Sequence, residues 1–144
     1  MSKILVTGAF GQIGTELTPA LQQKYGKDNV VALGHNKIPK VFDGIVEKAD
    51  INDLKKIQSI IKKYDIKEIY HLVSLLSVGG EAQPYLCWKV NMGGLINILD
   101  SAREYKLKVF WPSSIAAFGP TTPKNNTPQT TILEPTTIYG VTKV

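Results

Sequence analysis

Short apolar runs alternate along the chain with amphipathic segments of helical length. Runs dense in Ile, Leu and Val, each of strand size, occupy residues 3–7, 30–33, 44–48, 66–73 and 107–111. Gly, Pro and Asn separate several of these runs, as is usual between the elements of a folded domain. The pattern therefore predicts five strands.

Helices are expected at residues 12–25, 53–63 and 85–105, and another begins near Thr136 or Thr137. The residues at helical spacing that are expected to face a core are Leu54, Ile57, Ile60, Ile61, Leu95, Ile98 and Leu99. Pro19 lies inside the first helix, where a proline costs about 3 kcal/mol or causes a kink. Strands that alternate with helices predict a parallel sheet with right-handed crossovers, in one α/β domain that spans residues 1–144.

The composition limits the class of protein. Apolar residues make up 43% of the 144 residues and charged residues 20%, which is typical of a soluble globular chain. No apolar run is long enough to span a bilayer, and residues 1–3 lead into the first strand without a signal peptide. The single cysteine, Cys87, cannot form an internal disulfide and is read as a small buried residue on a helix. A cytoplasmic protein is expected.

The net charge of +5 raises the question of nucleic-acid binding. The densest lysine group is Lys55, Lys56, Lys62 and Lys63, which share one solvated helix face. No aromatic side chains are interleaved there to stack on bases, so neither a nucleic-acid nor a membrane partner is expected. The positive charge favours instead the approach of an anionic dinucleotide.

A glycine-rich turn follows the first strand. Gly8, Gly11 and Gly14 stand at G-x-x-G-x-x-G spacing, with Gln12 and Ile13 before the last glycine. Three glycines serve a tight turn, close approach of backbone to a pyrophosphate, and close packing of the helix on the sheet. Free N–H groups at the start of the helix bind the phosphate charge. The position of the turn between strand and helix predicts a dinucleotide site.

The end of the second strand departs from the usual dinucleotide pattern. An acidic residue is expected about 20 residues beyond the glycines to hold the ribose 2′-hydroxyl, and this chain has Gly34 there. The basic residues His35 and Lys37 follow, an arrangement that accommodates the 2′-phosphate of NADP. The alternative, that His35 and Lys37 are solvated loop residues, stays open.

A candidate catalytic group combines Tyr139 and Lys143, four residues apart on one helix face, with Ser114. The ammonium favours the phenolate form, which makes the phenol a better general base. Tyr85 and Lys89 share the same spacing but have no such serine, so Tyr85 is read as a core or surface residue. Ser114 follows the fifth strand, and active residues of open α/β sheets lie at the carboxyl ends of strands.

The glycine turn, Ser113-Ser114-x-x-x-Phe118-Gly119 and Tyr139-x-x-x-Lys143 together resemble the extended short-chain dehydrogenase/reductase (NAD-dependent epimerase/dehydratase) family. That resemblance implies a Rossmann-type doubly wound sheet with strand order 3-2-1-4-5. Within the family, residues 71–77, 88–92 and 109–129 are similar to the L-threonine 3-dehydrogenases. Those enzymes oxidise the 3-hydroxyl of L-threonine with NAD to 2-amino-3-ketobutyrate.

The resemblance also implies roles for individual residues. Tyr139 would be the base, Lys143 would hold the nicotinamide ribose, and Ser114 would orient the hydroxyl of a substrate that Ser77 also contacts. The implied cofactor-binding residues are Gly8, Gly11, Gln12, Ile13, Gly14, His35, Asp50, Ile51, Leu72 and Lys143. Asp50 would accept from the adenine amino group, although from its place before a helix it could equally be an N-cap. No metal site is expected.

Two departures from the family bear on these expectations. Gly34 replaces an acidic residue, so binding of both NAD and NADP is expected. Family members continue beyond residue 144 into a substrate-binding region, so this chain is expected to be the C-terminally truncated, cofactor-binding part of an enzyme that forms homodimers. The Tyr139 helix is expected to fray and the chain alone to oxidise threonine poorly. The alternatives are a nucleotide-sugar epimerase or dehydratase and a non-catalytic dinucleotide-binding module.

Overall fold

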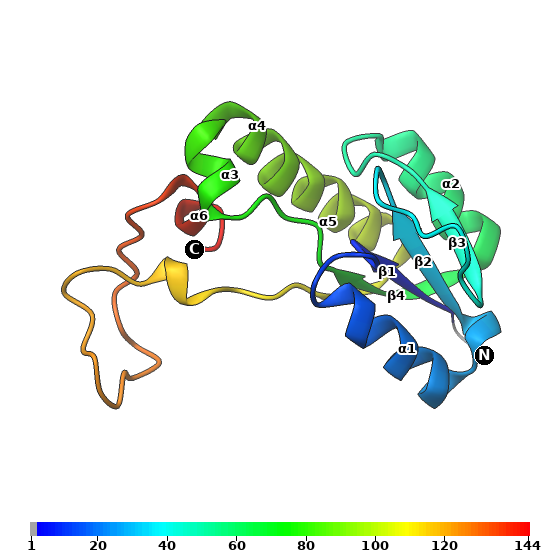
Figure 1. The fold of residues 1–144 in the computed structure, drawn as a ribbon, viewed down its shortest axis with the longest axis horizontal. Coiled ribbons are helices and arrows are strands. Elements are labelled where there is room, and N and C mark those ends of the chain that lie inside the picture. Colours follow the sequence, from blue (N-terminus) through cyan, green and yellow to red (C-terminus); the bar gives the residue numbers. More distant parts are fainter. Residues whose placement is uncertain (1–2) are drawn as a thin grey trace.

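The computed structural model describes residues 3–144. Met1 and Ser2, part of the amino-terminal segment in which no signal peptide is expected, lie outside the described residues. The described chain forms a five-stranded parallel sheet in the order β3-β2-β1-β4-β5 (Figure 1). The strands are β1 (Lys3–Thr7), β2 (Val30–Gly34), β3 (Ile45–Lys48), β4 (Ile66–His71) and β5 (Lys108–Phe110). The predicted α/β class and strand order are confirmed.

Helices cover both faces of this sheet. Helix α1 (Gly14–Tyr25) packs on one face, and α2 (Leu54–Tyr64) and α5 (Gly94–Tyr105) pack on the other (Figure 1). In the central strand β1, Leu5 points into the core under α2 and α5, while its neighbours Ile4 and Val6 point to the α1 side. All three are almost fully buried, which fixes the position of the turn that follows β1.

The predicted long helix at residues 85–105 is confirmed as a continuous helical stretch, but it is not α-helical throughout. It consists of α4 (Pro84–Trp88), a π-helical segment (Lys89–Gly93) and α5, and a short helix that was not predicted, α3 (Ser77–Ala82), precedes it. Leu99 is also not a core residue, since 49% of it is exposed. The contact stripe of α5 follows Leu95 and Ile98, and Leu99 lies about 100° further round the helix than Ile98.

Two other local features qualify the predicted helices. Pro19 lies within α1 without ending it, and both Pro19 and Thr15, whose carbonyl the proline leaves without an N–H partner, are exposed to solvent. The helix expected near Thr136 or Thr137 is α6 (Ile138–Val141), a single turn that Thr137 caps by accepting from Gly140 N at 2.9 Å. None of the helices in residues 3–144 has the length and apolarity needed to cross a membrane.

Candidate functional site

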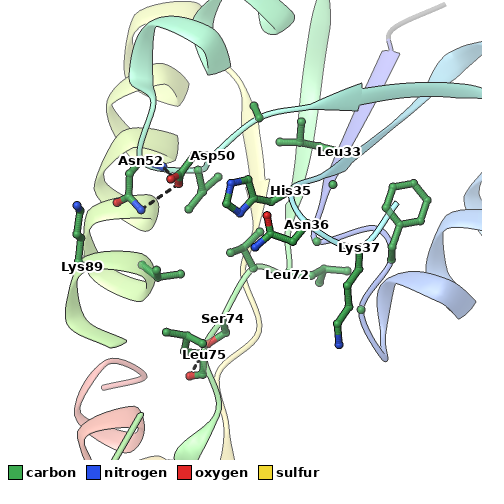
Figure 2. A pocket seen from close by; sticks show the side chains of 18 of the residues that line it. Leu33, His35, Asn36, Lys37, Asp50, Asn52, Leu72, Ser74, Leu75 and Lys89 are labelled. Carbon is green, nitrogen blue, oxygen red and sulfur yellow. Dashed lines mark hydrogen bonds between the residues drawn. The ribbon is translucent and has the colours of Figure 1, made fainter. Parts of the chain in front are cut away.

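A cavity of about 510 Å³ opens at the carboxyl ends of β1, β2, β3 and β4 (Figure 2). The loops after these strands form its wall together with α4 and the π-helical segment. Of the predicted cofactor residues, those that line it are Gly8, Gly11, His35, Asp50, Ile51 and Leu72. Gln12, Ile13 and Gly14 belong to the adjoining turn but do not line the cavity. The structure therefore brings together residues that are up to 64 positions apart in the sequence.

The glycines of the turn are required for different reasons. Gly8 has a φ of +71°, a left-handed conformation that disfavours other residues, and a Cβ there would lie 3.0 Å from the Leu72 carbonyl carbon. A Cβ on Gly14 would lie 2.3 Å from Gly8 O and 2.6 Å from the Ala9 carbonyl carbon, so the helix can approach the turn only through glycine. Gly11 is exposed, and its Cβ would meet Gly8 O at 3.3 Å. The turn is thus a backbone cradle whose outer side is open.

The end of β2 has no room for the missing acidic side chain. A Cβ at Gly34 would lie 2.6 Å from Ile38 Cγ1 and 2.7 Å from Phe10 Cδ2. His35 and Lys37 both line the cavity. Figure 2 shows His35 beside Asp50, and Lys37 on the side of His35 that faces away from Asp50. Apolar side chains therefore fill the place where a carboxylate was expected, and the basic residues His35 and Lys37 line the cavity near it.

Asp50 is oriented by the residue two positions further on. Its Oδ1 accepts from Asn52 N at 2.9 Å and from Asn52 Nδ2 at 3.2 Å (Figure 2). These hydrogen bonds, with the nearby charges of His35 and Lys89, hold the pKa of the Asp50 carboxyl below its ordinary value although burial opposes them. The alternative role for Asp50, as the N-cap of α2, is wrong. Asp53 is the cap and accepts from Lys56 N at 3.0 Å.

Tyr139 and Lys143 lie in and just after α6, outside the cavity lining. Lys143 is only 6% exposed, and burial lowers the pKa of its ammonium. Its Nζ donates to Pro112 O at 3.1 Å and lies 4.8 Å from the Trp111 ring centroid and 5.7 Å from the Tyr139 ring centroid. A cation is thus held between two aromatic rings, one of them the candidate base.

Ser114 and Ser77 begin short elements that pack on α6. Ser114 caps the 3₁₀ turn Ile115–Ala117, since its Oγ accepts from Ala116 N at 3.2 Å. That turn contacts α6 so closely that a Cβ on Gly140 would lie 2.2 Å from Ala116 O. Ser77 is the first residue of α3, which lies beside α6 (Figure 1). The three elements with predicted substrate-facing residues are therefore neighbours.

Three side chains from distant parts of the sequence hold α6. Glu81 Oε1, on α3, accepts from Ile138 N at 2.7 Å. Asn91 Nδ2 donates to Thr142 Oγ1 at 3.0 Å, and Ser113 Oγ donates to Lys143 O at 3.1 Å. These bonds oppose the expected fraying of this helix, which stays a prediction.

Asn91 is a site residue that the sequence reasoning missed. It lies in the π-helical segment and is 4% exposed. Its Oδ1 accepts from Leu75 N at 2.8 Å, and its Nδ2 donates to Leu75 O at 3.1 Å as well as to Thr142. One side chain thus links the cavity loop after β4 to the helix of Tyr139. A polar residue at a core-facing position of a predicted helix was the available signal.

His71 is buried between the glycine-turn strand and Lys143. It is 1% exposed, and its Nδ1 lies 2.8 Å from Thr7 Oγ1. Burial, reinforced by the charge of Lys143, lowers the pKa of the imidazole to about 4. The imidazole is therefore neutral at pH 7. Its Nε2 has no hydrogen-bond partner among residues 3–144.

The second tyrosine–lysine pair has a different environment. Tyr85 is 84% exposed on α4, and Lys89, which follows it, is exposed at the edge of the cavity. The interpretation of Tyr85 as a surface residue, one of the two readings left open, is confirmed. Cys87, two residues further on, is fully buried, as predicted.

Comparison with protein families gives one match over almost the whole chain. Residues 4–144 match the model of the NAD dependent epimerase/dehydratase family. A curated relative from Staphylococcus epidermidis, described as an uncharacterized epimerase/dehydratase, is 46% identical over 147 aligned positions. The alignment covers all of this chain and 46% of the relative, so the chain spans less than half the length of the relatives it matches.

Solved structures with the same fold include several dehydrogenases. A monomeric L-threonine 3-dehydrogenase from a metagenome is 50% identical with a TM-score of 0.93, over 97% of this chain and 45% of that one. The L-threonine dehydrogenase of Clostridium difficile is 49% identical with a TM-score of 0.94, over 99% and 46%. The UDP-glucose 4-epimerase of Thermotoga maritima is 25% identical with a TM-score of 0.87, over 98% and 47%.

Proposed function

The chain belongs to the NAD dependent epimerase/dehydratase family, and on that premise we propose that it is the cofactor-binding part of an L-threonine 3-dehydrogenase. One observation carries the proposal. The solved structures that are 49% and 50% identical to this chain over nearly its full length are L-threonine dehydrogenases, whereas the epimerase is 25% identical. The arrangement of Ser114, Tyr139 and Lys143 supports it, because it offers a hydroxyl, a phenol and a cation at one edge of the sheet.

The cavity fits a nicotinamide dinucleotide. Gly8 and Gly14 let the turn pack directly against the Leu72 backbone and against itself, and the exposed Gly11 leaves its outer side free of side chains, so the turn suits a ligand that approaches main-chain N–H groups, as a pyrophosphate does. Gln12 and Ile13 lie on the outer side of this turn and would contact the phosphates through their backbone. Asp50, with its Oδ1 occupied by Asn52, presents Oδ2 to an adenine amino group. Ile51 and Leu72 would contact the adenine base and the adjoining part of the dinucleotide.

The reacting end lies at α6. When bound there, a nicotinamide cofactor would supply the hydride acceptor for oxidation of the carbinol carbon of the substrate. Tyr139 takes the proton of the substrate hydroxyl, and the buried ammonium of Lys143 lies 5.7 Å from its ring centroid. Lys143 also presents its remaining N–H groups to the nicotinamide ribose. Ser114 Oγ accepts from Ala116 and still has its own hydrogen to donate to the substrate oxygen, while Ser77 contacts the substrate from α3.

The choice between NAD and NADP depends on the end of β2. The family description names NAD, whereas Gly34, His35 and Lys37 offer no carboxylate to repel a 2′-phosphate and two basic groups to attract one. We therefore expect the chain to bind both cofactors with little discrimination. Titration of each cofactor against the purified chain measures this directly. A strong preference for NAD would contradict the residue-level argument.

A nucleotide-sugar epimerase is the second candidate. The family description and the Thermotoga maritima epimerase favour it, since that enzyme shares the fold over 98% of this chain. The two candidates differ in substrate: one oxidises an amino acid with net reduction of the cofactor, and the other returns the hydride and releases no reduced cofactor.

The test uses this chain and a chimera in which the residues of the Clostridium difficile enzyme that follow the matched region are joined to it. Each is mixed with NAD and either L-threonine or UDP-glucose. Formation of reduced nicotinamide with L-threonine supports the dehydrogenase, and conversion of UDP-glucose to UDP-galactose supports the epimerase. A chimera that binds NAD but turns over neither substrate would favour a non-catalytic dinucleotide-binding module. Sedimentation of the same samples tests the proposed homodimer against a monomer such as the metagenome enzyme.

A further inference from the structure

The amino end of α6 depends on contacts from outside the helix. A helix of four residues leaves several N–H groups without partners inside the helix, and one turn is too short to be stable by itself in water. Thr137 satisfies Gly140 N from the adjacent position. The N–H of Ile138, which immediately precedes Tyr139, bonds a residue 57 positions away in the sequence.

That distant partner is Glu81, on α3. Its Oε1 accepts from Ile138 N at 2.7 Å, a short charge-assisted hydrogen bond at the helix end that favours negative charge. The two helices also pack closely, since a Cβ added to Gly80 would lie only 3.3 Å from Ile138 Cγ2. The contact therefore has both a packed part and a directional polar part.

We propose that Glu81 is a positioning residue that aligns the Tyr139 helix with the helix of Ser77. Glu81 touches none of the reacting groups itself. It is exposed, so its carboxylate is not needed to fill the core, and its bond fixes the amino end of α6 while Asn91 and Ser113 fix the carboxyl end. The proposal rests on the proposed function for its catalytic consequence, but the structural part can be tested without turnover.

The structural test is hydrogen exchange on this chain. Three amides report on α6: Val141 N bonds Thr137 O at 2.9 Å, Thr142 N bonds Ile138 O at 3.1 Å, and Lys143 N bonds Gly140 O at 2.9 Å. Their protection should fall about tenfold in Glu81→Ala and much less in Glu81→Gln, because the amide oxygen of Gln can still accept. Unchanged protection in Glu81→Ala, or amides already unprotected in the wild type, would overturn the proposal.

Glu104 provides a matched control. It is also an exposed carboxylate that ties two helices together, since its Oε2 accepts from Gln58 Nε2 at 2.8 Å between α5 and α2. Glu104→Ala should leave the exchange of Val141, Thr142 and Lys143 unchanged. If it lowered their protection as much as Glu81→Ala does, the effect would be one of general stability and the positioning role would be rejected.

The functional test uses the chimera described above. Misplacing a catalytic group by about 1 Å can cost as much as 10²-fold in rate. Glu81→Ala should therefore lower kcat for L-threonine by about ten- to a hundredfold while the dissociation constant of NAD stays within about twofold, and Glu81→Gln should recover most of the rate. Loss of NAD binding together with kcat would contradict the proposal. If the wild-type chimera has no turnover, the proposed function fails and hydrogen exchange alone decides the role of Glu81.

Discussion

The glycine turn and the Tyr139 helix, the two ends of the proposed site, are held in different ways. The turn follows β1, the central strand, which pairs in parallel with β2 and β4 and is buried on both faces. Its shape depends on backbone and on where glycines stand. The Tyr139 helix is one turn long and is held by single side-chain bonds from Glu81, Asn91 and Ser113. The proposed cofactor end is thus fixed by the sheet, and the proposed reacting end by a few replaceable side chains.

The largest effect expected from this comparison concerns the two tyrosines. In the chimera, Tyr139→Phe keeps the aromatic ring but removes the proton acceptor, so turnover of L-threonine should fall by about 10²-fold or more. Tyr85→Phe is the matched control, because Tyr85 also precedes a lysine by four residues but is 84% exposed. Its turnover should stay close to that of the wild type. Equal losses in the two variants, measured by reduced nicotinamide formation, would contradict the assignment of Tyr139 as the general base.

The next effect concerns His71, which lies where the two regions meet. Histidine in the unfolded chain titrates near its ordinary pKa of 6.5, whereas the pKa of folded His71 is about 4. Below pH 6.5 the unfolded state therefore binds a proton that the folded state does not, and the stability present above pH 6.5 is lost as the pH falls towards 4. The loss amounts to roughly 3 kcal/mol.

Urea unfolding at pH 7, 6, 5 and 4 measures the free energy of unfolding of the wild type and of His71→Gln. The variant should lack the loss between pH 6.5 and 4. Glu47 and Asp50, whose carboxyl pKa values lie below normal, contribute stability that is lost at lower pH in both proteins, so they do not confuse the comparison. Parallel pH dependence in the two proteins would show that His71 is not the titrating group.

A smaller effect separates two glycines of the turn. Gly14→Ala should destabilise the chain by about 1–3 kcal/mol and weaken NAD binding, because the added methyl would overlap the backbone at Gly8 O and Ala9. Gly11→Ala should change the free energy of unfolding by less than about 1 kcal/mol, since Gly11 is exposed and the nearest atom is 3.3 Å from the added Cβ. Denaturant unfolding of the wild type and both variants measures these changes in the free energy of unfolding. Similar destabilisation by both would refute the distinction between the packed and the open side of the turn.

The smallest effect concerns Lys37. Lys37→Ala should weaken NADP binding by about 1 kcal/mol, or roughly fivefold, and leave NAD binding unchanged, since only NADP carries the 2′-phosphate. Lys40→Ala is the control, because Lys40 is exposed and does not line the cavity. Fluorescence titration of both cofactors provides the measurement. This replacement is a cleaner probe than Gly34→Asp, whose Cβ would first have to displace Phe10 and Ile38.

The same difference between the two regions explains what the sequence could predict. The strands and the glycine turn follow from local patterns, because each apolar run and the glycine spacing lie within a few consecutive residues, whereas the strand order was implied by the family resemblance. The side-chain hydrogen bonds from Glu81, Asn91 and Ser113 that hold α6 join residues 57, 51 and 30 positions apart. No local sequence pattern predicts such pairs. Asp50 and Asp53 illustrate the limit at short range: both could cap α2, and the choice depended on backbone geometry.

The π-helical segment joins two helices that serve different parts of the molecule. Cys87 and Asn91, before and within the segment, bond Leu75, and Asn91 also bonds Thr142. Leu95 and Ile98, after the segment, are buried, and Ile98 belongs to the core under α2 and α5. Each residue of an α-helix turns the chain by about 100°, and a π turn holds more residues than an α turn. A change of one residue in this segment would therefore alter how the residues on its two sides face their partners.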